Sequence, residues 1–239
     1  MDKNLVNIVR YIIDQISLDL QVNSIEDIFD GLILVGNKIY VCNTLHITIG
    51  KIVKDSLGNE YVVKDFEFNK WVEVIIKDPL LPFTGLVLIA PEIMYLHGSP
   101  ASTNNEYLLI NSRTLKKTPF IWLLESYEYD NLPLDSSVVA SYSVRLFFMD
   151  WANVPKWKND QHNELVIKPM ENLSKAFTNV IENDYSFKRL GSFKTVVRPR
   201  FGVEVSDRGS DKVIINENLS GVDLSLTLEL FNTEICCKN

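Results

Sequence analysis

The chain has 239 residues, of which 46% are hydrophobic and 23% are charged, and its formal net charge is -7. A chain this apolar and this weakly charged can bury enough surface to fold, which excludes intrinsic disorder for most of its length. Its 3 Cys exclude a disulfide framework, and with only 3 His they leave few of the side chains that most often serve as general bases, thiolate nucleophiles or transition-metal ligands. The composition favours one large domain or two small ones in a reducing compartment, and it disfavours an enzyme.

The first segment, residues 1–30, is predicted to be an N-terminal helix that packs on the rest of the chain. Its apolar residues recur at spacings of three and four and therefore line one face of a helix: Leu5, Ile8, Val9, Ile12, Ile13 and Ile16. Asp2, Asp14 and Asp19 interrupt the segment, so it does not have the uncharged core of a signal peptide. No stretch of the chain approaches the roughly 18 consecutive apolar residues that predict a membrane span.

Residues 31–117 are predicted to form a β-rich domain. Short alternating runs are separated by turn residues at Gly36 and Asn37 and again at 55–59, which is typical of a meander. Several short strands of this kind favour a small antiparallel barrel or a sandwich. The small polar residues of HGSPASTNNEY, 97–107, predict an exposed loop.

Residues 118–239 are predicted to form a second, α+β domain, a sandwich of one long helix on an antiparallel sheet. A long strand at 137–151 and a polar loop at 152–164 precede a helix that ends near Asp184. Because proline fits only the first helical turn, Pro169 puts the start of this helix near Lys168. Strands are predicted at 192–205, 211–219 and 221–231. In the last of these strands the leucines alternate with polar residues, of which Asp223 is expected to face solvent.

The motifs of common catalytic and cofactor sites are not found in the sequence. Glycine-rich phosphate loops, HExxH, GxSxG and CxxC do not occur. His46 is expected in a strand, and His97 and His162 are expected at the surface, without a partner at metal-ligand spacing. Cys236 and Cys237 are expected in a frayed tail. The sequence therefore predicts no catalytic residue, no cofactor and no metal.

Two acidic clusters allow a chemical and a structural interpretation. Glu204, Asp207 and Asp211 surround Gly209, where they fit either a hard cation or an ordinary hairpin turn, and the turn is favoured. Glu125, Glu128 and Asp130 fit either a carboxylate pair of the kind that hydrolyses glycosides or the solvated face of a strand.

A basic run near residue 194 is another candidate for a functional surface, because it could face a phosphate backbone. Lys194, Arg198 and Arg200 share a parity and hence one face of a predicted strand. A solvated sheet face or a salt-bridged protein interface is the favoured interpretation. In a ring, the same face would be able to line a lumen through which DNA passes.

The second half carries a series of segments that resembles a known class of protein. These segments, in order, are TPFIWLLESYEYD, a long strand ending in FFMDW, the helix opening ELVIKPMENLSKAF, RPRFGVEV and NENLSGVDLSLTLEL. The series resembles ring-forming neck proteins of tailed bacteriophages, of the tail-completion and tail-terminator type, particularly in crAss-like and other Bacteroides phages. The resemblance covers residues 118–239, and the β-rich region would then be an addition or an insertion.

The resemblance implies a structural, non-enzymatic subunit of the virion neck or tail. The subunit would form a homo-oligomeric ring with other neck, tail and portal proteins, away from any membrane, and viral double-stranded DNA would pass through the lumen without sequence-specific binding. Trp151 and Trp157 would anchor in a neighbouring subunit, or alternatively cap their own core. Two other functions stay open: a monomeric carbohydrate- or ligand-binding module, and a carboxylate-dependent hydrolase.

Overall fold

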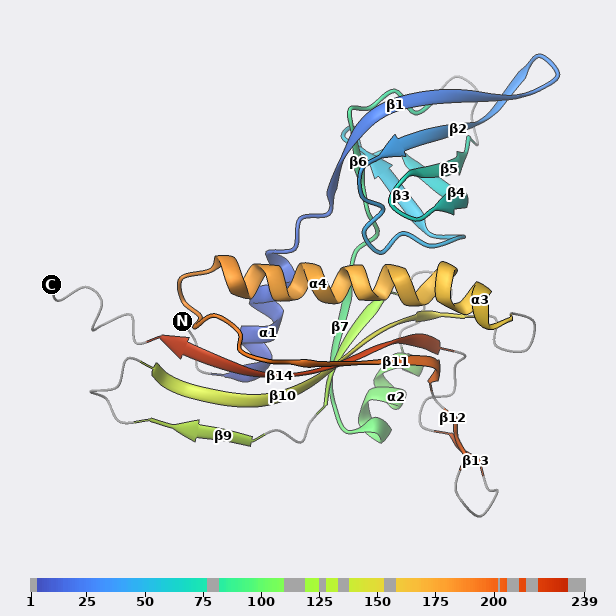
Figure 1. The fold of residues 1–239 in the computed structure, drawn as a ribbon. Coiled ribbons are helices and arrows are strands. Elements are labelled where there is room, and N and C mark those ends of the chain that lie inside the picture. Colours follow the sequence, from blue (N-terminus) through green and yellow to red (C-terminus); the bar gives the residue numbers. More distant parts are fainter. Residues whose placement is uncertain are drawn as a thin grey trace, which may run out of the picture.

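The chain folds into a closed β-barrel and a larger body of helices on a second sheet, with the long helix α4 between them (Figure 1). The computed structural model describes residues 4–76, 82–109, 119–124, 128–132, 138–152, 158–201, 203–205, 211–213 and 219–231. The predicted α+β class is confirmed, and the β-rich half is a barrel.

The barrel consists of six strands that close in the order β1-β2-β5-β4-β3-β6. Their bounds are β1 Asp19–Asp30, β2 Ile33–Val41, β3 Ile52–Asp55, β4 Glu60–Glu67, β5 Trp71–Ile75 and β6 Val87–Ile89. Alternate positions point inward, where Ile39, Val53, Val72, Val74 and Leu88 are fully buried. The predicted turn at 55–59 is confirmed, because the Asp55 carboxylate accepts hydrogen bonds from the backbone N–H groups of Leu57 and Asn59.

The β1–β2 hairpin extends past the barrel as a two-stranded arm, which we define as residues 25–35. Strand β2 pairs with β5 only from Gly36 onward, whereas β1 and β2 stay paired out to Asp30 and Ile33. Gly31 turns the hairpin at φ 62°, a left-handed conformation that favours glycine. The turn is therefore at Gly31, and the predicted turn at Gly36 and Asn37 was wrong because both residues are buried within β2.

The second body is built on a sheet in the order β11-β14-β10-β8-β7, with β9 also pairing with β10. The strand bounds are β7 Met94–Gly98, β8 Phe120–Leu124, β9 Glu128–Asn131, β10 Val138–Trp151, β11 Lys194–Phe201 and β14 Leu219–Phe231, and a small hairpin is formed by β12 Val203–Val205 and β13 Asp211–Val213. Strands β10 and β14 pair along their whole length. They form the centre of the sheet.

Helices cover the two faces of this sheet unequally. Helices α1 (Leu5–Asp14) and α4 (Lys168–Asn183) pack on one face, around Leu146, Phe148 and Leu224. A short helix α3 (Asn159–His162) and a π-helical turn (Asn163–Ile167) lead into α4 without a break. On the other face α2 (Pro100–Leu109) covers a smaller cluster, which includes Trp122 and Phe147. No other helix among the described residues packs on that second face.

Helix α2 corrects two predictions. The segment 97–107 is not an exposed loop, because Thr103 and Tyr107 are fully buried and the Ser99 hydroxyl accepts a hydrogen bond from the Ser102 N–H at the start of the helix. Since α2 crosses over between β7 and β8, these two strands are parallel, so the sheet is mixed rather than purely antiparallel.

The bodies also differ from the predicted divisions 1–30, 31–117 and 118–239. Residues 19–30 form strand β1 of the barrel rather than a continuation of the N-terminal helix. Helix α1, β7 and α2 belong to the second body, so the barrel is inserted between α1 and β7. None of the helices in the described part of the chain is long and apolar enough to cross a membrane.

Candidate functional site

The sheet carries a buried aspartate on each face, and each is held by two cationic or hydroxyl donors. On the helix-covered face, Asp150 near the end of β10 accepts hydrogen bonds from Lys51 Nζ at 2.6 Å and from Thr48 Oγ1 at 2.7 Å. Both partners come from the barrel loop between β2 and β3. The Lys51 and Asp150 side chains are only 2% and 0% exposed, so the pair ties the barrel to the sheet out of reach of solvent. Burial lowers the pKa of the Lys51 ammonium, and Asp150 partly offsets this shift.

His46 belongs to the same junction between barrel and sheet. It lies in a turn rather than in the predicted strand, fully buried, with Nε2 2.7 Å from the carbonyl oxygen of Pro91. Burial lowers its pKa to about 4, because the charged imidazolium is disfavoured without solvent. Near the barrel, the Asn172 side chain of α4 donates a hydrogen bond to Asn69 Oδ1 at 3.1 Å.

On the opposite face, Asp223 of β14 joins Arg145 of β10 and Arg198 of β11. Arg145 donates to both carboxylate oxygens, from Nε at 2.9 Å and from Nη2 at 2.5 Å, and Arg198 donates from Nη2 at 3.0 Å. Asp223 is 2% exposed, but both arginines are 41% exposed. Burial raises the pKa of the Asp223 carboxyl, but the hydrogen bonds from the two arginines outweigh it, so the pKa lies below its usual range. The prediction that Asp223 faces solvent was wrong, because the two arginines cover it.

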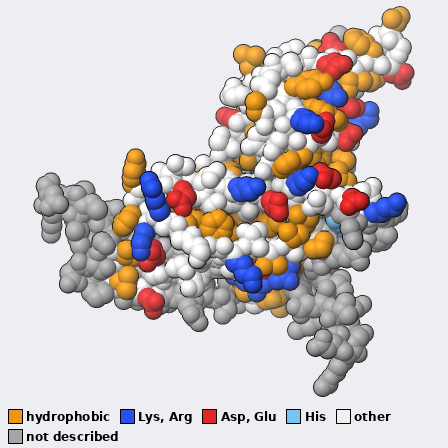
Figure 2. Space-filling view, in the orientation of Figure 1, with side chains coloured by type: hydrophobic (Ala, Val, Ile, Leu, Met, Phe, Trp, Pro, Cys, Tyr) orange, Lys and Arg blue, Asp and Glu red, His pale blue; other side chains and the backbone are white. Residues whose placement is uncertain are grey.

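An open depression, which we call the basic groove, begins beside this cluster. It has a volume of about 500 Å³ and is lined by Leu124, Ser143, Arg145, Phe193, Lys194 and Thr227, among others. Lys194 is exposed at the start of β11, and Phe193 is 49% exposed. Figure 2 shows Lys and Arg side chains gathered where β11 lies at the sheet edge. Among the described side chains of this part of the sheet face, three cations surround one buried acid, which leaves a net positive charge.

The arm has the opposite character. Its end exposes large apolar side chains, with Phe29 59%, Leu32 99% and Ile33 61% exposed. Figure 2 shows hydrophobic side chains at the tip of the arm and acidic side chains near them. The sequence from Tyr11 to Asn37 contains no Lys or Arg, whereas the arm contains Glu26, Asp27 and Asp30.

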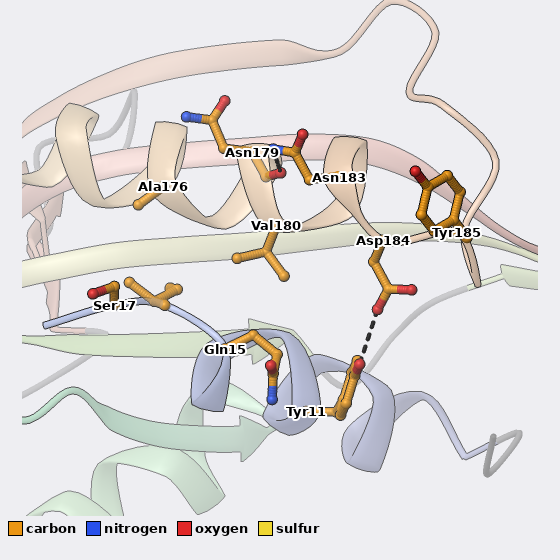
Figure 3. Close-up of a pocket in the computed structure, with 10 residues that line it drawn as sticks. Tyr11, Gln15, Ser17, Ala176, Asn179, Val180, Asn183, Asp184 and Tyr185 are labelled. Carbon is orange, nitrogen blue, oxygen red and sulfur yellow. Dashed lines mark hydrogen bonds between the residues drawn. The ribbon is translucent and has the colours of Figure 1, made fainter.

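A second depression lies between α1 and α4 (Figure 3). It has a volume of about 560 Å³, and its lining combines tyrosines with amides, including Tyr11, Gln15, Asn179, Asn183 and Tyr185. The Tyr11 hydroxyl donates to Asp184 Oδ2 at 2.9 Å, and this hydrogen bond raises the pKa of Tyr11. The lining contains one acid and no cation, so this depression does not share the positive charge of the basic groove.

The structure brings together only part of the predicted basic set. Lys194 and Arg198 both lie on β11 at the open sheet face, while Arg200 belongs to the same strand and its side chain lies outside the described residues. Trp151 ends β10 and is partly buried. Trp157 lies outside the described residues, so nothing places it beside Trp151.

The remaining candidates do not form a site in the described part of the chain. His97 is exposed on β7, as expected, whereas His162 is buried in α3 with Nδ1 3.1 Å from Ser220 Oγ, so its predicted surface position was wrong. Asp130 is exposed on β9. Several other candidates lie outside the described residues: Glu125, Asp207, Cys236 and Cys237. The same holds for the side chains of Glu128, Glu204 and Asp211. Within the described residues, no three His, Cys, Asp or Glu side chains are placed to hold a metal ion.

Sequence reasoning missed Lys51, Asp150 and Arg145, which hold the two clusters. A signal existed for Asp150, because it shares the inward parity of Leu146 and Phe148 in an otherwise apolar strand. A charged residue at such a position requires a buried partner. Lys51 offers no comparable signal, since it lies between a turn and β3 and its burial depends on the contact between barrel and sheet.

Comparisons with protein-family models, with curated proteins and with solved structures find no match to this chain.

Proposed function

We propose that this chain is a structural subunit of a homo-oligomeric ring in the neck or tail of a tailed phage, where it joins the portal or connector to the tail. The observation that carries the proposal is the arm, which presents Phe29, Leu32 and Ile33 to solvent at the end of a projecting hairpin. Large apolar side chains exposed at such a tip contribute little to the isolated fold, and they are typical of a surface that a partner covers.

Two further observations support a scaffold that assembles with neighbours. Strand β11 lies at the sheet edge and supplies exposed residues of the basic groove. The buried junction of Lys51 and Asp150 fixes the barrel to the sheet, so a contact made by the arm is transmitted to the whole subunit. The net charge of -7 suits a channel for DNA, because a strongly basic lumen would retain the phosphate backbone.

The particle size of the purified full chain tests this proposal. Mass photometry at increasing protein concentration is expected to show one discrete multiple of the 27.4 kDa subunit. Negative-stain electron microscopy of that species is expected to show a closed ring with an open centre. A chain that stays monomeric at every concentration, including after chemical cross-linking, would contradict the proposal.

The second depression, between α1 and α4, favours a second candidate function, a monomeric carbohydrate-binding module. Exposed tyrosines and side-chain amides, here Tyr185, Asn179 and Asn183, are the groups that pack against and hydrogen-bond sugar rings. This alternative predicts a monomer that binds an oligosaccharide, with binding lost in Tyr185→Ser. The ring proposal predicts an unchanged ring in the same variant.

A further inference from the structure

We infer that the arm of one subunit docks into the basic groove of a second copy of the chain. The inference rests on the proposed ring and specifies its contact. The arm and the basic groove are both exposed, and they are complementary in charge and in polarity.

The arm supplies acids next to an apolar tip. Glu26, Asp27 and Asp30 lie on β1, and in the hairpin register Lys38 lies opposite Glu26 at the base. The Asp27 carboxylate accepts a hydrogen bond from Asn37 at 2.7 Å, and Glu26 accepts one from the Tyr40 hydroxyl at 3.0 Å. Neutral donors leave both carboxylate charges in place, so the arm retains a net negative charge.

The groove supplies cations next to an exposed aromatic ring. Arg145 and Arg198 share the single carboxylate of Asp223, which leaves positive charge unbalanced, and Lys194 adds to it. Phe193, which lines the groove beside Lys194, is 49% exposed. Next along the face Glu128 and Asp130 of β9 lie opposite Ser143 and Ser141, so the positive region is confined to the row of Arg145 and Lys194 and the neighbouring Arg198.

The arm and the groove cannot meet within one subunit. Figure 1 shows the barrel and its arm on one side of α4 and the sheet on the other. The groove residues Arg145 and Lys194 lie on the sheet face that points away from α4, opposite the face of Leu146 and Leu224. Contact therefore joins different surfaces of two copies, and such a heterologous contact closes into a ring when the rotation between neighbours allows it.

Charge reversal on the full-length chain tests the pairing. Asp30→Lys and Lys194→Glu are each expected to weaken subunit association by about tenfold or more, as measured by mass photometry over a dilution series. The double variant with both changes is expected to recover association, because the two charges are exchanged across the contact. Leu32→Ser is expected to weaken association to a similar degree through the loss of the apolar tip.

Two matched controls and the ring test separate the outcomes. Lys175→Glu changes an exposed lysine on α4, and Tyr185→Ser changes a side chain that is 97% exposed, and both are expected to leave association unchanged. The docking is wrong if the ring forms equally well in both single charge variants, or if the double variant does not recover association. In either case the proposal of a ring is unaffected. A monomeric wild-type chain overturns both proposals. If Lys194→Glu weakens binding of a DNA duplex and leaves association unchanged, the groove is a nucleic-acid surface and the inference is wrong.

Discussion

The two aspartates on opposite faces of the central sheet have similar donors but different surroundings. Asp150 and its partner Lys51 are sealed between the barrel and the sheet, at 0% and 2% exposure. Asp223 is just as buried, yet its partners Arg145 and Arg198 are each 41% exposed and continue into an open groove. The buried pair of Lys51 and Asp150 is inaccessible to another molecule, whereas the Arg145 and Arg198 guanidinium groups are accessible. The sealed pair therefore serves the fold, whereas the open cluster is available for the contact proposed between subunits.

The largest effect is expected from breaking the sealed pair. Lys51→Met leaves the Asp150 carboxylate buried without its cation, which is expected to lower the free energy of unfolding by about 3–5 kcal/mol. Urea unfolding followed by circular dichroism measures this. Adding Asp150→Asn removes the uncompensated charge and keeps an acceptor for Thr48, so the double variant should regain a large part of the loss. A cost below about 1 kcal/mol for Lys51→Met would show that water reaches the junction.

The same junction predicts a dependence of stability on pH. Because the folded pKa of His46 is about 4 and the ordinary value is 6.5, the unfolded chain binds this proton first as the pH falls. Stability is full above about pH 6.5 and declines toward pH 4, by about 2 kcal/mol between pH 7 and pH 5. The variant His46→Gln keeps a donor for the Pro91 carbonyl and is expected to show a smaller decline. Equal declines in the two proteins would assign the effect to other groups.

The open cluster is expected to matter less for folding. Asp223→Asn removes the charge that holds two arginines, but both side chains reach solvent and are hydrated there. The loss in the free energy of unfolding is expected to be about 1–2 kcal/mol, below that of Lys51→Met. A loss as large as that of Lys51→Met would mean that the two regions do not differ in the way proposed.

Helices and strands with a regular local pattern of apolar residues could be predicted from the sequence. Features that depend on which element packs against which face could not. The spacing of Leu173, Phe177 and Ile181 predicted α4, and the strict alternation around Leu224 predicted β14. Helix α2 was missed because its sequence, PASTNNEYLL, has a weak apolar face and is anchored through Thr103 and Tyr107. For the candidate site, Lys194 and Arg198 were found from parity, but Arg145 was not, because its place beside Arg198 depends on how β10, β14 and β11 pair.

The smallest effect on folding is expected at the tip of the arm. Leu32 is 99% exposed, and in the described structure its side chain contributes nothing to the core of the barrel. Leu32→Ser is therefore expected to change the free energy of unfolding of the dissociated subunit by less than about 0.5 kcal/mol, while the same change weakens association. Urea unfolding at a concentration where the wild-type chain is dissociated measures the first quantity, because oligomerisation itself adds apparent stability. A clear loss of stability in that dissociated state would mean that the Leu32 side chain packs within its own subunit. The exposed tip would then no longer be evidence for a contact between subunits.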